Sequence, residues 1–132
     1  MTRLLLLALL LGLACSSPER EERVRVSAGI ERLRSVPSSD LSARARAADE
    51  LAALAVSVAG PRAARDACAK AYRTSTEMYE LLGKLEAQVR ADEPVDNPKQ
   101  LAEDYRRVES MRDQAAEELD VCNARAAELA QP

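Results

Sequence analysis

Two stretches of the chain carry a stripe of mostly apolar residues at alternating spacings of three and four, the pattern of a coiled-coil seam. In residues 61–91 the stripe consists of Cys68, Ala71, Ser75, Met78, Leu82, Leu85 and Val89. In the stretch from 97 to about 130 it consists of Leu101, Tyr105, Val108, Met111, Ala115, Leu119 and Cys122. A stripe of this period is buried only when two helices pack along their length, so it constrains the fold more than any other feature.

A proline-containing segment, residues 92–98, separates the two stretches. Within it Asn97 is the expected cap of the second helix, with Pro98 at the first helical position and Gln100 able to complete a capping box. If the second stretch folds back on the first about residue 95, seam residues that lie equally far before and after residue 95 come opposite each other. Met78 and Met111 differ from this rule by one position. The other layers pair Val89 with Leu101, Leu85 with Tyr105, Leu82 with Val108, Ser75 with Ala115, Ala71 with Leu119 and Cys68 with Cys122. This agreement of register predicts a long antiparallel helical hairpin over residues 61–131.

Two shorter helices are expected before the hairpin. The first covers residues 18–35, with Ser17 as its cap and Pro18 in its first turn, and should bury Val26, Ile30 and Leu33. The second covers residues 41–59, and Gly60-Pro61 should end it as a turn or a kink. Alanine and leucine supply most of the apolar content and only three residues are aromatic, a composition typical of helical proteins. The expected fold is all-α, a three- to four-helix bundle.

The N-terminus has the pattern of an export signal. Arg3 precedes an uninterrupted apolar run from Leu4 to Ala14, which is shorter than the about 20 residues that cross a bilayer. The run has no amphipathic period, which argues against the alternative of a short buried helix of the domain. Residues 1–14 are therefore expected to be a signal peptide, residues 15–20 a modified cysteine with its tether, and residues 21–132 a single helical domain.

The end of this run, Gly12-Leu13-Ala14-Cys15, resembles the lipobox of bacterial lipoproteins, with Gly12 where that family usually has an aliphatic residue. The resemblance implies cleavage before Cys15, a diacylglycerol on its sulfur and a further acyl chain, such as palmitate, on its amino group. Ser16 after the cysteine implies sorting to the outer membrane, facing the periplasm. A cleaved signal without lipid is the alternative. Several acyl chains would hold the protein on the membrane, since each buried CH2 contributes about 0.8 kcal/mol.

The remaining cysteines, Cys68 and Cys122, fall in the same layer of the predicted hairpin. An exported protein reaches an oxidising compartment, in which paired cysteines form disulfides. We therefore expect a Cys68–Cys122 disulfide, the alternative being two free buried thiols that face each other.

Two further pairs of side chains have both a structural and a functional interpretation. Tyr72 and Tyr79 lie seven residues apart beside the seam, where they could form a partner-binding surface or cover the second helix; covering is favoured. Met78 and Met111 could be soft copper ligands, but core packing is favoured because no further soft donor lies in their layer.

The composition limits the possible functions. The chain has no histidine, which removes the commonest general base and metal ligand, and its formal charge of −3 gives no basic surface for nucleic acid. We expect no enzyme, cofactor, metal or small-molecule substrate. The leading hypothesis is a non-enzymatic envelope lipoprotein that acts as a helical scaffold or docks a protein partner, with a ligand-binding or chaperone-like periplasmic bundle as the alternative.

Overall fold

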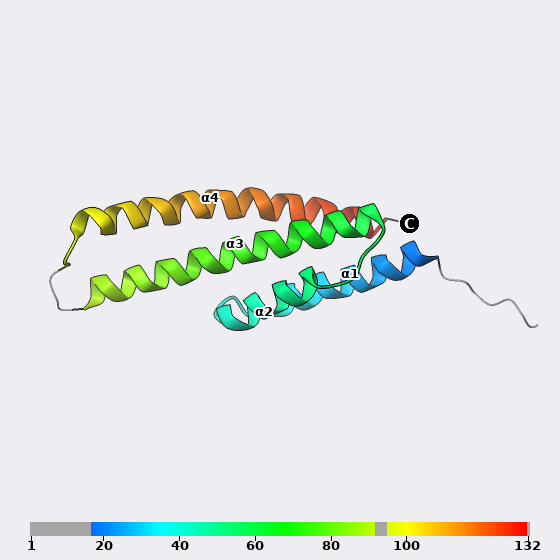
Figure 1. Ribbon diagram of the computed structural model, residues 1–132, viewed down its shortest axis with the longest axis horizontal. Coiled ribbons are helices and arrows are strands. Elements are labelled where there is room, and N and C mark those ends of the chain that lie inside the picture. Colours follow the sequence, from blue (N-terminus) through cyan, green and yellow to red (C-terminus); the bar gives the residue numbers. More distant parts are fainter. Residues whose placement is uncertain (1–16, 92–94, 132) are drawn as a thin grey trace, which may run out of the picture.

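The computed structural model describes residues 17–91 and 95–131, and four helices make up most of that part of the chain (Figure 1). They are α1 (Pro18–Ser35), α2 (Leu41–Ala52), α3 (Ala59–Arg90) and α4 (Pro98–Leu129). The described residues contain no strand, and the two long helices α3 and α4 pack antiparallel. The all-α fold and its helical hairpin are confirmed. The same residues form no helix that is long and apolar enough to cross a membrane.

Side-chain caps begin three of the helices. The side chain of Ser17 accepts a hydrogen bond from the backbone of Arg20, at 3.3 Å, and starts α1. Asp40 starts α2 and Asn97 starts α4 in the same way, with N–O distances of 2.9 and 3.0 Å. The Gln100 side-chain amide donates to Asp104, one turn further along α4, at 3.1 Å.

The second helix is shorter than predicted. It ends at Ala52, and the following segment reaches α3 in a largely non-helical conformation. Gly60 and Pro61 do not form a separate turn, since both lie in the first turn of α3 and Pro61 is buried there. The chain therefore changes direction over residues 53–58, before the Gly60-Pro61 pair that was expected to mark the break.

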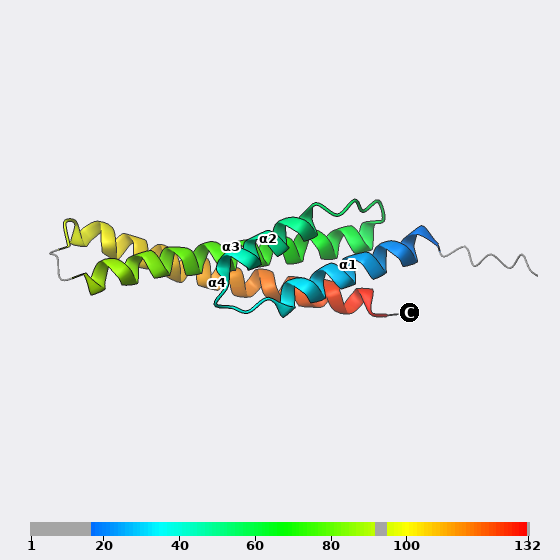
Figure 2. The ribbon, with the colours of Figure 1, turned by 90° about the horizontal axis from the view of Figure 1, so that it is seen from below.

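The helices alternate in direction, and α1 and α2 cover only one half of the hairpin (Figures 1 and 2). We call this half the base: it comprises α1, α2, residues 59–77 of α3 and residues 113–129 of α4. The remainder, residues 78–90 of α3 and 98–112 of α4, is the arm, which is two helices thick. The start of α1 and the end of α4 lie together at the base, and the end of α3 and the start of α4 form the opposite end, which we call the tip.

Each half has its own apolar core. In the base, α1 buries Val26, Ile30 and Leu33, as predicted, against Ala48 and Leu51 of α2. Leu51 Cδ1 lies 2.9 Å from the position that a Cβ on Gly29 would occupy, so the absence of a side chain there lets α1 and α2 approach closely. The arm core is smaller and consists of Met78, Leu85 and Val108, with Leu81, Leu82, Leu101, Tyr105 and Met111 partly buried around them.

Candidate functional site: an uncovered helical arm

The disulfide joins α3 to α4 in the centre of the base. Cys68 and Cys122 are both fully buried, and their Cα atoms are 4.5 Å apart. The bridge confirms the register predicted from the seam, because the two cysteines occupy the layer that the other pairs define. It fixes the end of the hairpin that lies opposite the tip.

The arm keeps most of its predicted seam but not the outermost layer. Leu85 and Val108 are buried between the helices, and both methionines pack in the same cluster, as the core interpretation of that pair expects. Val89 is 55% exposed, so the outermost predicted layer, Val89 with Leu101, is not buried as the seam predicts. The last turn of α3 therefore contributes little to the core.

The two tyrosines of α3 lie in different surroundings. Tyr72 is only 9% exposed and packs in the base core, with the Arg44 guanidinium of α2 5.0 Å from its ring centroid. Tyr79 is 45% exposed, one heptad further towards the tip. The pair therefore does not act as a unit: Tyr72 covers α2, as the structural interpretation expects, and Tyr79 remains accessible for a partner.

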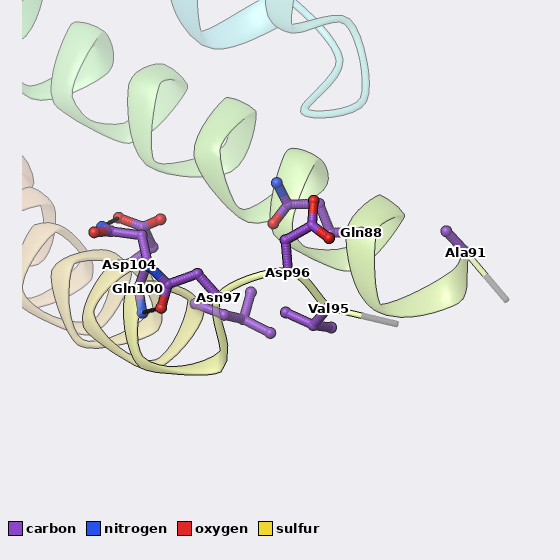
Figure 3. A pocket seen from close by; sticks show the side chains of 8 residues that line it. Gln88, Ala91, Val95, Asp96, Asn97, Gln100 and Asp104 are labelled. Atoms are coloured by element: carbon purple, nitrogen blue, oxygen red, sulfur yellow. Dashed lines mark hydrogen bonds between the residues drawn. The ribbon is translucent and has the colours of Figure 1, made fainter. Parts of the chain in front are cut away.

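A shallow hollow of about 280 Å³ lies at the tip, between the end of α3 and the start of α4 (Figure 3). Its polar side chains are Gln88 from α3, Asp96, and three residues at the start of α4: Asn97, Gln100 and Asp104. Asn97 already caps α4 and Gln100 already donates to Asp104, as the dashed lines in Figure 3 show. These groups begin a helix and bond to one another, so the hollow is not built as a ligand site.

One buried carboxylate joins α1 to the segment between α2 and α3. Glu22 of α1 accepts hydrogen bonds from the Ser57 hydroxyl at 2.6 Å, the Val58 amide at 2.7 Å and the Ser57 amide at 3.0 Å. The bond from the Ser57 side chain contributes most, and together these bonds lower the pKa of Glu22 to about 2. Glu22 thereby accepts hydrogen bonds from the backbone amides just before α3, although it lies 35 residues before Ser57 in the sequence.

Two arginines hold the same segment by its carbonyl groups. Arg25 of α1 donates to Ala55 at 3.3 Å, and Arg65 of α3 donates to Leu54 at 2.6 Å. Their hydrogen bonds replace those that a continued α2 would make within itself. No local sequence signal points to these contacts, because the donors and acceptors lie between 11 and 36 residues apart.

A second carboxylate joins the long helices on the other side of the hairpin. Glu118 of α4 accepts from Gln114 at 2.8 Å and lies 3.1 Å from the Lys70 ammonium of α3. Burial raises the pKa of Glu118, but hydrogen bonds from Thr74, Gln114 and Lys70 outweigh burial and leave it below the usual value. This cluster supports the packing of α3 on α4.

The structure places the predicted site residues as follows. Cys68 and Cys122 are brought together, Tyr72 is buried and Tyr79 is exposed, whereas Cys15 lies outside the described residues. Among residues 17–91 and 95–131, no group of three or more cysteine or acidic side chains is placed to hold a metal ion. No protein-family model, curated protein or solved structure matches the chain.

Proposed function

We propose that the chain is a non-enzymatic lipoprotein of the bacterial cell envelope, whose helical domain holds a docking arm away from the membrane. The observation that carries this proposal is the division of the hairpin into a covered base and an uncovered arm (Figure 1). Partly buried side chains such as Leu81, Tyr105 and Met111, together with exposed Tyr79 and Val89, line an arm only two helices thick. Apolar side chains on a helical face are what partner helices bind.

The position of the N-terminus supports an anchor at the base. α1 begins at Pro18, so only Ser16 and Ser17 separate it from Cys15. The start of α1 is tied to the chain end, since Arg23 donates to the Gln131 carbonyl at 2.8 Å. A lipid on Cys15 would therefore keep the base close to the membrane. α3 has 32 residues, so the tip would lie roughly 48 Å from its start.

The cysteine usage supports the same assignment. Of the three cysteines, Cys68 and Cys122 are joined to each other, which leaves Cys15 for modification. The lipobox-like sequence ending at Cys15 and the serine that follows favour an outer-membrane anchor, with the domain in the periplasm. A scaffold in that position needs no cofactor, and its ligand is a protein partner.

Photo-crosslinking in intact cells tests the docking role. A photo-reactive amino acid at Val89 on the arm should crosslink to a protein of the envelope, whereas the same residue at Val24 on α1, which is 63% exposed, is the matched control in the base. Crosslinks from Val24 with none from Val89, Tyr79 or other exposed arm positions would contradict the arm as the docking surface.

Cell fractionation tests the anchor independently. Replacing Cys15 by alanine should move the protein from the membrane fraction to the soluble periplasmic fraction. Substitution of Ser16 by alanine is a control that should leave it on the membrane. If a Cys15→Ala protein that has lost residues 1–14 is retained on the membrane as well as the wild type, the lipid anchor is wrong.

A further inference from the structure

A thin layer of the seam separates the apolar core of the base from that of the arm. The register assigns this layer to Ser75 of α3 and Ala115 of α4, which are 7% and 4% exposed. Ala115 belongs to neither apolar cluster, and Ser75 places a hydroxyl group between them. Beside it the Thr76 hydroxyl donates to the Tyr72 carbonyl at 2.8 Å, a bond of the kind that bends helices. The two cores therefore meet at a weak layer.

Only apolar packing joins α3 to α4 within the described arm. In the base, the two helices are joined by the disulfide and by Lys70, whose ammonium lies 3.1 Å from Glu118. In residues 78–90 and 98–112, by contrast, each side-chain hydrogen bond and ion pair stays within its own helix. Closure of the arm therefore depends on the small apolar cluster around Leu85.

Several restraints hold the base closed and do not reach the described arm. The bridge between Cys68 and Cys122 joins α3 to α4 covalently. α1 and α2 cover the base and stop before the arm (Figures 1 and 2). Glu22 and Arg65 tie α1 and α3 to the segment between α2 and α3. Separation of the two arm helices would break none of these contacts.

We infer that the arm opens as one unit at the layer of Ser75 and Ala115, while the disulfide keeps the base closed. The two arm helices have no more than about 15 residues each, a length at which isolated helices are marginal in water, so their backbone hydrogen bonds weaken when they separate. Opening exposes Met78 and Met111, whose flexible side chains adapt to apolar partners of varied shape. The arm thus acquires a second binding surface between its helices. This motion goes beyond the proposed docking role and holds with or without a lipid at Cys15.

Hydrogen exchange tests whether the arm opens as a unit. The full chain, reconstituted in lipid vesicles, is followed region by region by mass spectrometry. Amides of residues 79–86 and 102–111 should share one protection factor, at least about tenfold lower than that of residues 64–74 and 115–125 in the base. Protection that falls gradually towards the tip would be fraying of the helix ends and would overturn the unit. Equal protection of arm and base would overturn the opening itself.

Thiol alkylation tests the exposure of the seam and the position of the weak layer. Val108→Cys places a thiol in the arm core, and Val26→Cys, the same change in the base core, is the matched control. The Val108→Cys thiol should react at least about tenfold faster. Adding Ser75→Ala should slow that reaction about fivefold, because the closed arm then no longer buries a hydroxyl group. Ser110→Ala, at an exposed position of α4, should leave the rate unchanged. Equal thiol rates at the two valine positions, or equal effects of the two serine substitutions, would overturn the inference.

Discussion

Loss of the Cys68–Cys122 bridge should lower the free energy of unfolding by about 4 kcal/mol. The bridge spans a sequence separation of 54, and closing a loop of that length restricts the unfolded chain by about this amount in the chain-entropy model. Domains of this size are stable by only about 5–15 kcal/mol, so the change should be large in a urea titration followed by circular dichroism. The comparison uses the oxidised and reduced forms of the same chain, which differ in no side-chain volume.

The effect should also be local. Both cysteines lie in the base, whereas the arm has its own core around Leu85 and Val108. Hydrogen exchange should therefore speed up in α1, α2 and the base ends of α3 and α4 on reduction, while total helix content is largely kept. A difference below about 1 kcal/mol, or faster exchange confined to the arm, would refute this reasoning.

Glu22, Gly29 and the tyrosines of α3 support further predictions. The lowered pKa of Glu22 stabilises the fold above pH about 4.5, and this contribution is lost as pH falls towards about 2. Glu22→Gln should therefore melt at a lower temperature than the wild type at pH 7. The difference in melting temperature should shrink as the pH falls from about 4.5 to about 2, and a difference that does not change with pH would contradict this. Gly29→Val should cost about 2 kcal/mol in urea titration by overpacking against Leu51, and an unchanged midpoint would disprove the close approach. Tyr72→Ala should cost about 3 kcal/mol and Tyr79→Ala less than about 1, and equal losses would contradict their different burial.

The hairpin could be predicted from the sequence because its determinants are local and periodic. The heptad stripe sets which faces meet, and the loop centre sets the register, so the layer of Cys68 and Cys122 followed directly. The starts of α1 and α4 were predicted for the same reason, since Ser17 and Asn97 act on amides only three residues away.

The end of α2 could not be predicted in this way. Its alanine-rich pattern continues through residues 53–58, and helix propensity alone favours a longer helix. The segment is instead held by Glu22, Arg25 and Arg65, whose partners are distant in sequence. The sequence did not single out Glu22, because it follows directly on Glu19 and Glu21, the acidic residues that favour the start of α1.

The exposure of Val89 had a similar cause. Its position in the heptad predicts burial, but Val89 belongs to the outermost layer of the seam, which has a neighbouring layer on one side only. The extent of the arm depended likewise on where α1 and α2 stop, which is a property of tertiary packing. Tyr72 and Tyr79 occupy the same heptad position, and only the length of α2 separates a core residue from an exposed one.

The central claim is that this domain is held on a membrane by a lipid at Cys15, and mass spectrometry of the mature N-terminus tests it most directly. The protein should be purified from the membrane fraction of a bacterial host in detergent and digested. We expect an N-terminal peptide that begins at Cys15 and carries a diacylglycerol and an additional acyl chain. An unmodified N-terminus at Ser16 or beyond, or a chain that keeps residues 1–14, would contradict the claim.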